Sequence, residues 1–397
     1  MARLARVEVF APDEIAIVHV MNRVVRRCFL LGNDPVTGNN YDHRKVWIEE
    51  QLQRLAACFG VDLLCFAILS NHFHLILRSR PDVVATWNDT EVARRWLMLC
   101  PVRKNDEGFA EEPNEAELNM VRNDPQRLET IRLRLSDIAW WMRLLCQNIA
   151  VRANHEDREM GKFWQSRYRA VRLLDEQAIL ACAAYVDLNP IRAAMAETLE
   201  ESDFTSVQRR IQALQQEAGN ATGQSVDNAL TRIESATIVT PQSSTGASPE
   251  VSGQLVADRF LSPLTIDERH NPIGSDASSI GHVGDVARVG TDQEFRYGFR
   301  CSNKGFLSMS VADYLVLLDW TARRLVDGKP GSTPHDTPPV FERLSIDPHV
   351  WCKLVGGFGR LFWNVAGRPR TIDATRSRIG QHRYHIPKQT RDLLPTA

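Results

Sequence analysis

Residues 62–77 read DLLCFAILSNHFHLIL, and this stretch decides the fold. Two apolar runs typical of strands flank the polar pair Ser70-Asn71, which is typical of a tight turn. His72 and His74 stand two residues apart, so on a strand both project from the same face. The apolar residues that follow each histidine then project from the other face, toward a helical layer. The stretch predicts an antiparallel hairpin with one polar and one apolar face.

Apolar periodicity on either side of the hairpin predicts a strand over 14–20 and helices over 45–59, 136–152 and 176–188. Ser136 or Asp137 can cap the second of these helices. The third is expected to end before Pro190, because proline disfavours the α region for the residue before it. This order of elements predicts an α+β fold with helices packed on one face of an antiparallel sheet. The other face is expected to stay free for chemistry.

The 397 residues exceed what one hydrophobic core usually fills, so two domains are expected. Residues 1–215 form the first, with a long, charged insertion of helices and loop at about 80–130. Residues 216–257 are rich in Gly, Ala, Ser, Thr, Gln and Asn and are expected to be a flexible linker. Residues 258–397 regain apolar patterning as a mainly helical accessory domain. Within it, an amphipathic helix is expected over 309–325.

The sequence has no run of eighteen apolar residues, and its first residues lack the apolar segment of a secretory signal. We therefore expect a cytoplasmic protein with no membrane partner. Eight cysteines without a Cys-x-x-Cys pair favour small buried side chains in a reducing compartment. A net charge of -1 argues at first against a nucleic-acid partner. It averages an acidic stretch at 104–117 with a basic one after 356, however, and only the local balance bears on DNA binding.

Two pairs of residues point to chemistry. His72 and His74 lie within reach of one metal ion, although partly buried strand histidines are an equally ordinary reading. Tyr185 and Asn189 stand four residues apart, so on a helix they share a face. A tyrosine hydroxyl with a pKa near 10 is a poor nucleophile unaided, but beside a metal it can attack phosphorus. The competing reading of Tyr185 is a residue packed on the sheet.

Four segments together resemble a family. Residues 70–77 (SNHFHLIL) are similar to the His-hydrophobic-His motif of single-tyrosine HUH transposases, and more closely to the branch associated with repetitive extragenic palindromes. Residues 163–169 (FWQSRYR) and 185–193 (YVDLNPIRA) resemble the second half of that branch's signature. Residues 18–27 (VHVMNRVVRR) are similar to its first stretch.

The resemblance implies a ferredoxin-like core that cuts single-stranded, hairpin-flanked DNA with Mg²⁺ or Mn²⁺. It makes His72 and His74 metal ligands, Tyr185 the nucleophile and Asn189 the third ligand. A 5′-phosphotyrosine and a free 3′-hydroxyl would form, and the reverse step would rejoin strands. Tyr168 is the competing nucleophile, although its two arginine neighbours favour a phosphate-contacting stretch in which the ring stacks on a base.

The nucleic-acid contacts that the resemblance implies come from Asn22, Arg23, Arg167, Tyr168, Arg169 and Arg192. The insertion could be a dimer element, a DNA clamp or a tolerated loop, so a homodimer is one expectation. The C-terminal region adds basic residues that suit DNA or simply form a solvated surface: Arg360, Arg368, Arg370, Arg376, Arg378, Arg383, Lys388 and Arg391.

Three functions stay open: an active metal-dependent DNA nickase and strand transferase, a domesticated transposase that binds DNA hairpins without cutting, and an unrelated metal hydrolase. The last leaves the 185–193 signature unexplained.

Overall fold

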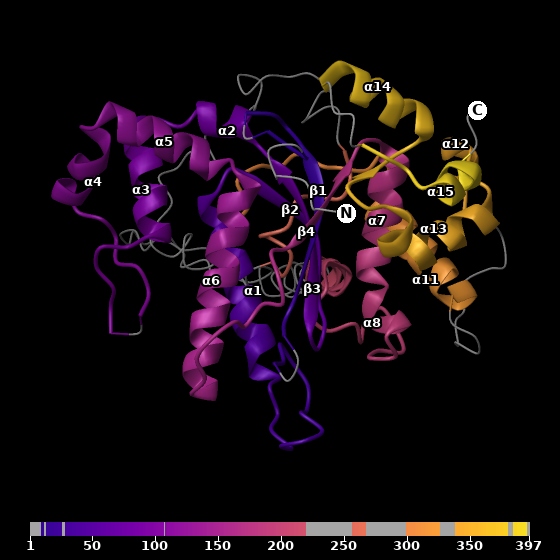
Figure 1. Cartoon of the computed structure of the whole chain (residues 1–397), viewed down its shortest axis with the longest axis horizontal. Helices are drawn as coiled ribbons and strands as arrows, with labels where there is room; N and C mark the ends of the chain where they lie inside the picture. Colours follow the sequence, from indigo (N-terminus) through magenta and orange to yellow (C-terminus); the bar gives the residue numbers. More distant parts are fainter. Residues whose placement is uncertain are drawn as a thin grey trace, which may run out of the picture.

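The computed structural model describes residues 9–11, 13–25, 28–106, 108–219, 256–266, 299–325, 338–379 and 384–394. Its centre is a five-stranded sheet in the order β2-β3-β1-β4-β5 (Figure 1). The strands are β1 (Ile17–Arg23), β2 (Val61–Ile68), β3 (His72–Ser79), β4 (Arg169–Leu173) and β5 (Val365–Ala366). Neighbours are antiparallel except β4 and β5, which run parallel. The prediction of a wholly antiparallel sheet is therefore wrong at this edge, where a distant segment adds the short fifth strand.

The predicted hairpin is confirmed. β2 and β3 pair antiparallel, and the amide of Leu69 donates to the carbonyl of His72 at 2.9 Å to close the turn. Phe73, Leu75 and Leu77 of β3 all point into the larger hydrophobic core. This is the face that the alternation of the sequence assigned to a helical layer.

Two long helices cover that face: α1 (His43–Cys58) and α6 (Ile138–Asp157). Leu52 and Leu55 of α1 and Trp141 and Leu145 of α6 pack with the apolar β3 residues in one cluster. The carboxylate of Asp137 accepts from the amide of Ala139 at 2.7 Å, so Asp137 is the cap of α6. The insertion consists of helices and loops, as predicted. Its helices are α2 (Pro81–Ala85), α3 (Asp89–Leu99), α4 (Glu115–Arg122) and α5 (Pro125–Leu135).

Helices also cover the opposite face, which corrects the prediction that this face is free. The remaining helices are α7 (Glu176–Asp187), α8 (Asn189–Arg192), α11 (Val311–Leu325), α12 (Val340–Leu344), α13 (Pro348–Leu361), α14 (Pro369–Ile379) and α15 (Lys388–Leu393). Leu180 of α7, Leu354 of α13 and Ile76 of β3 belong to one buried cluster, and Figure 1 shows α13 beside α7. The second face of the sheet is thus covered by α7, on which α13, from far along the chain, packs in turn.

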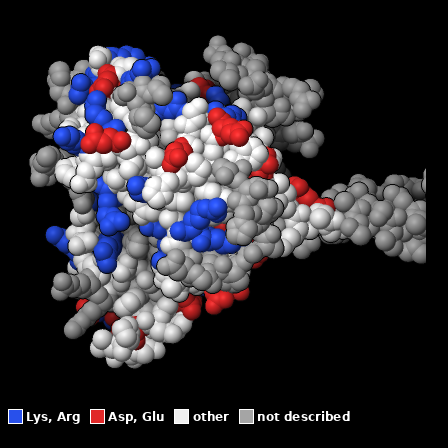
Figure 2. Space-filling model, turned by 90° about the vertical axis from the view of Figure 1, so that its right-hand side faces the viewer, with Lys and Arg blue, Asp and Glu red and all other residues white. Residues whose placement is uncertain are grey.

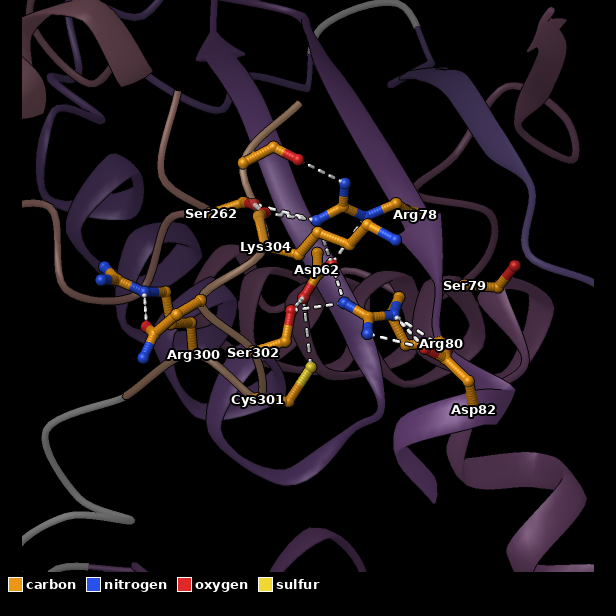
Figure 3. Close-up of polar contacts among 12 residues, drawn as sticks. Asp62, Arg78, Ser79, Arg80, Asp82, Ser262, Arg300, Cys301, Ser302 and Lys304 are labelled. Atoms are coloured by element: carbon orange, nitrogen blue, oxygen red, sulfur yellow. Dashed lines mark hydrogen bonds and ion pairs between the residues drawn. The ribbon is translucent and has the colours of Figure 1, made fainter. Parts of the chain in front are cut away.

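Buried polar contacts fasten the C-terminal segments to the sheet (Figure 3). Asp62 of β2 is 1% exposed and pairs with Arg78 at 2.6 Å and with Arg80 at 3.3 Å. Its other oxygen accepts from the hydroxyl of Ser302 at 2.7 Å, and Arg78 donates to the carbonyl of Lys304 at 2.6 Å. We call these five residues the Asp62 cluster. It joins β2 and β3 to a segment more than 200 residues away in the chain.

The expected linker, 216–257, lies outside the described residues except at its two ends. The division of the chain into two domains stays a prediction. Among the described residues, no helix is both long enough and apolar enough to cross a membrane.

Candidate active site

The alternation of three strands brings the site together on the face covered by α7 and α13. His74 of β3 lies opposite Met21 of β1, and His72 lies opposite Arg23. His19, two residues before Met21 on β1, therefore joins the two predicted histidines on this face. The Nε2 atom of His19 lies 2.9 Å from the Nδ1 atom of His74, and their rings stack at 5.2 Å. The rings of His72 and His74 are 5.0 Å apart.

The two histidines predicted to bind the metal are each oriented by a hydrogen bond at Nδ1, which leaves Nε2 for the metal. The Nδ1 atom of His72 lies 2.7 Å from Oδ1 of Asn71, an acceptor, so Nδ1 carries the proton and Nε2 holds the lone pair. His74 uses its Nδ1 atom on His19, and its Nε2 atom is buried without a hydrogen-bond partner. Metal-binding histidines characteristically have this second contact, and a buried nitrogen without a partner is costly unless something occupies it.

Burial keeps these imidazoles neutral. It lowers the pKa of His19 to about 3, assisted by the charge of Arg169, and the pKa of His72 to about 4, assisted by Arg23. The pKa of His74 also lies well below 6.5, through burial first and then through His19 and the other cations around it. Neutral imidazole is the form that binds a metal.

Tyr185 meets the rings of His19 and His74 edge-on. His72 lies outside the lining of the cavity that these three residues share. Tyr185 comes from α7, and its ring centroid is 5.3 Å from that of His74. α7 ends at Asp187 and Asn189 opens α8, so the predicted helix end before Pro190 is confirmed. Asn189 nevertheless stays close enough to Tyr185 to lower its pKa. Burial raises the pKa of Tyr185, while Arg192, whose guanidinium lies 5.2 Å from the ring centroid, and Asn189 oppose this rise.

The last turns of α13 form the outer wall of the site. Phe358 stacks on Tyr185 with centroids 5.7 Å apart, and a Cβ atom on Gly359 would stand 3.0 Å from the tyrosine hydroxyl. Arg169 donates to the carbonyls of Gly359 and Phe362, and Arg192 donates to that of Gly356. The two arginines thus hold the C-terminal end of α13 over the histidines, where the helix dipole favours cations.

Between these walls lies a cavity of about 300 Å³. His19, His74, Arg169, Tyr185 and Arg192 line it, together with residues 356–360 of α13. Neutral nitrogens, guanidinium groups and a phenol face one another there, a combination suited to an anion such as a phosphate.

The residues present fit a metal ion, provided that oxygen atoms complete the shell. Within the described ranges, no group of three or more His, Cys, Asp and Glu side chains is placed to hold a metal ion. A metal on His72 and His74 would therefore need Asn189, water or substrate oxygens as further ligands.

The residues predicted to contact nucleic acid separate into two groups. Arg169 and Arg192 face the histidine cavity. Asn22, Arg167 and Tyr168 line a second cavity of about 530 Å³, in which Asn22 and Tyr168 are buried and Arg167 is exposed. Arg23 is exposed at the end of β1, opposite His72.

Sequence reasoning missed His19, Phe358 and Gly359. His19 had a local signal, because alternation along β1 puts it on the same face as Met21, but only the pairing of β1 with β3 brings it to His74. Phe358 and Gly359 had no such local signal, since nothing near them in the sequence indicates a contact with Tyr185.

The basic C-terminal residues do not form one continuous surface. Arg360, Arg370, Arg376, Arg378, Lys388 and Arg391 are exposed, whereas Arg383 lies outside the described residues. Arg368 is partly buried and donates to Gln177, and Arg391 pairs with Asp373 at 3.3 Å. Figure 2 looks onto this side of the molecule and shows Lys and Arg in separate groups with acidic side chains among them.

No family model matches the chain, and a search of curated proteins found no match. A solved structure described as a REP-associated tyrosine transposase bound to a REP hairpin is similar over 53% of this chain and 86% of its own. The identity is 10% and the TM-score is 0.30. So loose a superposition supports no conclusion about this chain.

Proposed function

We propose that this chain is a transposase-type DNA endonuclease that nicks and rejoins single-stranded, hairpin-flanked DNA through a 5′-phosphotyrosine at Tyr185. The observation that carries the proposal is the meeting of His72 and His74, both oriented for a metal, with Tyr185 at 5.3 Å from the second histidine. The order β2-β3-β1-β4 supports the finer expectation of a ferredoxin-like core, with α1 between β1 and β2 and the helices α2–α6 between β3 and β4.

His72 and His74 would hold the metal through Nε2, and Asn189 could add its amide oxygen. Two imidazoles favour a transition metal, so Mn²⁺ fits better than Mg²⁺. A bound metal supplies Lewis-acid polarisation of the scissile phosphate.

Tyr185 attacks the phosphorus with its hydroxyl oxygen, and the phenol proton passes to water. The P–O bond to the 3′ oxygen breaks, and that oxygen takes up a proton to become a 3′-hydroxyl. Arg192 and Asn189 stabilise the phenolate that develops, since both lower the pKa of Tyr185 against the effect of burial. The phosphodiester energy is kept in the phosphotyrosine, so a 3′-hydroxyl can reverse the step and rejoin strands.

The test is incubation with single-stranded hairpin DNA and Mn²⁺, followed by denaturing electrophoresis. Wild type is expected to form a covalent adduct that disappears with EDTA and with Tyr185→Phe. Tyr168→Phe is the matched control, since it removes the hydroxyl of the competing nucleophile and keeps its ring, and it should keep the adduct. An adduct that survives Tyr185→Phe, or none from wild type, contradicts the proposal.

A second candidate is a hairpin-binding protein that does not cut DNA. The cover of α13 over a largely buried Tyr185 favours it. It predicts tight hairpin binding, insensitive to His72→Ala and to chelators, with no adduct.

A further inference from the structure

The second cavity belongs to the opposite face of the sheet from the histidines. It lies between the first turns of α6 and the segment 164–168 that leads into β4, with Asn22 of β1 at its wall. At about 530 Å³ it has the size of a small-ligand site. The chemistry proposed for Tyr185 uses none of its side chains.

Its walls combine aromatic rings with cations. Trp140 and Trp164 are both partly exposed and line the cavity. Trp164 is held in place, because its Nε1 atom donates to the carbonyl of Cys146 at 2.7 Å and its ring meets Phe73 edge-on at 5.5 Å. Arg143, exposed at the rim, lies 4.6 Å from the centre of the Trp140 ring.

The rim is basic, whereas the interior offers a fixed amide. Arg143 and Arg167 are both exposed there. The carboxylate of Asp137, the acidic residue of the lining, is engaged as the cap of α6. Asn22 is 4% exposed and is anchored on both sides, donating to the sulfur of Cys146 at 3.3 Å and accepting from the amide of Arg23 at 3.1 Å.

The two cavities lie at the same end of the sheet. Arg23, next to Asn22, is paired directly opposite His72. Because successive strand residues face opposite sides, Asn22 points into the second cavity while His72 lies on the catalytic face. A DNA strand that crosses this end of the sheet over Arg23 would therefore reach both sites with neighbouring nucleotides.

We propose that the second cavity receives one unpaired base of the DNA strand that Tyr185 attacks, with Arg23 and Arg167 on the phosphates beside it. The inference rests on the proposed function, because the base in the cavity belongs to the DNA strand that Tyr185 cleaves. Aromatic and guanidinium planes bind the flat face of any base, and an anchored amide can read the base edge. A purely structural gap would not need two cations at its mouth.

The test measures binding without chemistry. Fluorescent single-stranded hairpin oligonucleotides, with an abasic site placed at each flanking position in turn, are titrated with Tyr185→Phe protein in EDTA and followed by anisotropy. One abasic position should weaken binding roughly ten-fold, as expected for the loss of one stacked base. Trp140→Ala should weaken the binding of the intact oligonucleotide by a similar factor. It should not further weaken the binding of the oligonucleotide with that abasic position.

Trp47→Ala is the matched control, since Trp47 is also partly exposed and stacked on an arginine, Arg152, at 3.8 Å. It should bind all oligonucleotides like the parent. In wild type, alkylation of Cys146 mapped by peptide mass spectrometry should be slowed by the intact oligonucleotide and not by the critical abasic one. The alkylation experiment uses the wild-type protein, so its result does not depend on whether a variant folds.

Equal binding by all abasic oligonucleotides, or unchanged Cys146 alkylation, overturns the base pocket. If the wild-type adduct with Mn²⁺ still forms, the proposed function stands without the pocket. If neither binding nor an adduct occurs, the proposed function itself fails.

Discussion

At the scale of single residues, the site depends on which ring nitrogen of each histidine is engaged in a hydrogen bond and which is left for a metal. His19 fixes the ring of His74 through Nδ1 and leaves Nε2 buried and available. Because its Nε2 atom is engaged by His74, His19 acts through that histidine and is a positioning residue.

His19→Phe should keep a ring in this space but remove the hydrogen bond to His74. We expect Mn²⁺ affinity to fall about 10- to 100-fold, as is usual when an orienting partner of a ligand is lost. Isothermal titration calorimetry without DNA would measure it. His43→Phe is the control, because His43 is exposed and pairs with Glu156 away from the site. Equal affinity of wild type and His19→Phe would show that His74 needs no such partner.

The buried imidazoles also set a pH dependence of stability. An unfolded chain protonates histidine near pH 6.5, whereas His19 and His72 stay neutral in the fold down to about pH 3 and pH 4. Between pH 6.5 and 4 the unfolded state binds more protons, so the free energy of unfolding falls as the pH is lowered.

In EDTA, urea denaturation across this range should show that fall, on the order of 2 kcal/mol for each buried imidazole. His19→Phe should flatten the profile, because one such imidazole is gone. Identical slopes for both proteins would rule out a depressed pKa at His19.

At the scale of elements, α13 decides how much space Tyr185 has. Gly359 lets the helix approach so closely that a Cβ atom at this position would stand 3.0 Å from the hydroxyl of Tyr185. The wall of the site therefore depends on a helix from the opposite end of the chain.

Gly359→Val should obstruct the hydroxyl and reduce the rate of adduct formation at least ten-fold. The fold should survive, since Gly359 is partly exposed and valine costs a helix no more than glycine does. Lys353→Val is the control, because it puts the same side chain at an exposed position of the same helix that does not line the cavity. A Gly359→Val protein that forms adduct at the wild-type rate would mean that α13 moves away during the reaction.

At the scale of the whole molecule, the Asp62 cluster ties the C-terminal segments to the sheet. Burial alone would raise the pKa of Asp62, but Arg78 and Arg80 overcome it and hold this pKa below its ordinary value. The carboxylate therefore stays charged at neutral pH, and its contribution to stability is lost only as the pH falls through that lowered pKa.

Asp62→Asn should cost roughly 3–5 kcal/mol of unfolding free energy, because it leaves the buried Arg78 without its counter-charge and Arg80 with Asp82 alone. Urea denaturation would measure this cost, and limited proteolysis should cut within 299–309 sooner than in wild type. Asp82→Asn removes a more exposed partner of Arg80 and should cost about 1 kcal/mol or less. Similar losses of unfolding free energy for the two variants would show that the Asp62 cluster does not hold the C-terminal segments to the sheet.

Much of the fold could be predicted because its signals are local. The hairpin of β2 and β3, the cap of α6 and the end of α7 each follow from the spacing, capping or proline of a few neighbouring residues. The shared face of His72 and His74 follows from strand alternation in the same way. The second face was not expected to be covered, although α7, which packs on it, was predicted as a helix. The packing of α13 on α7 could not be predicted, because α13 comes from beyond the expected linker.

The sequence by itself determined the α+β class, the first three strands with the helices α1, α6 and α7, and the pairs His72–His74 and Tyr185–Asn189. It gave no sign of β4 and β5. Only the tertiary structure decided that His19 orients His74, that Arg169 binds carbonyls 190 residues away, and that Phe358 and Gly359 enclose Tyr185. The physical reason is that periodicity and capping act within a few turns of chain. Burial of apolar surface acts between any two faces that fit, whatever their separation in sequence.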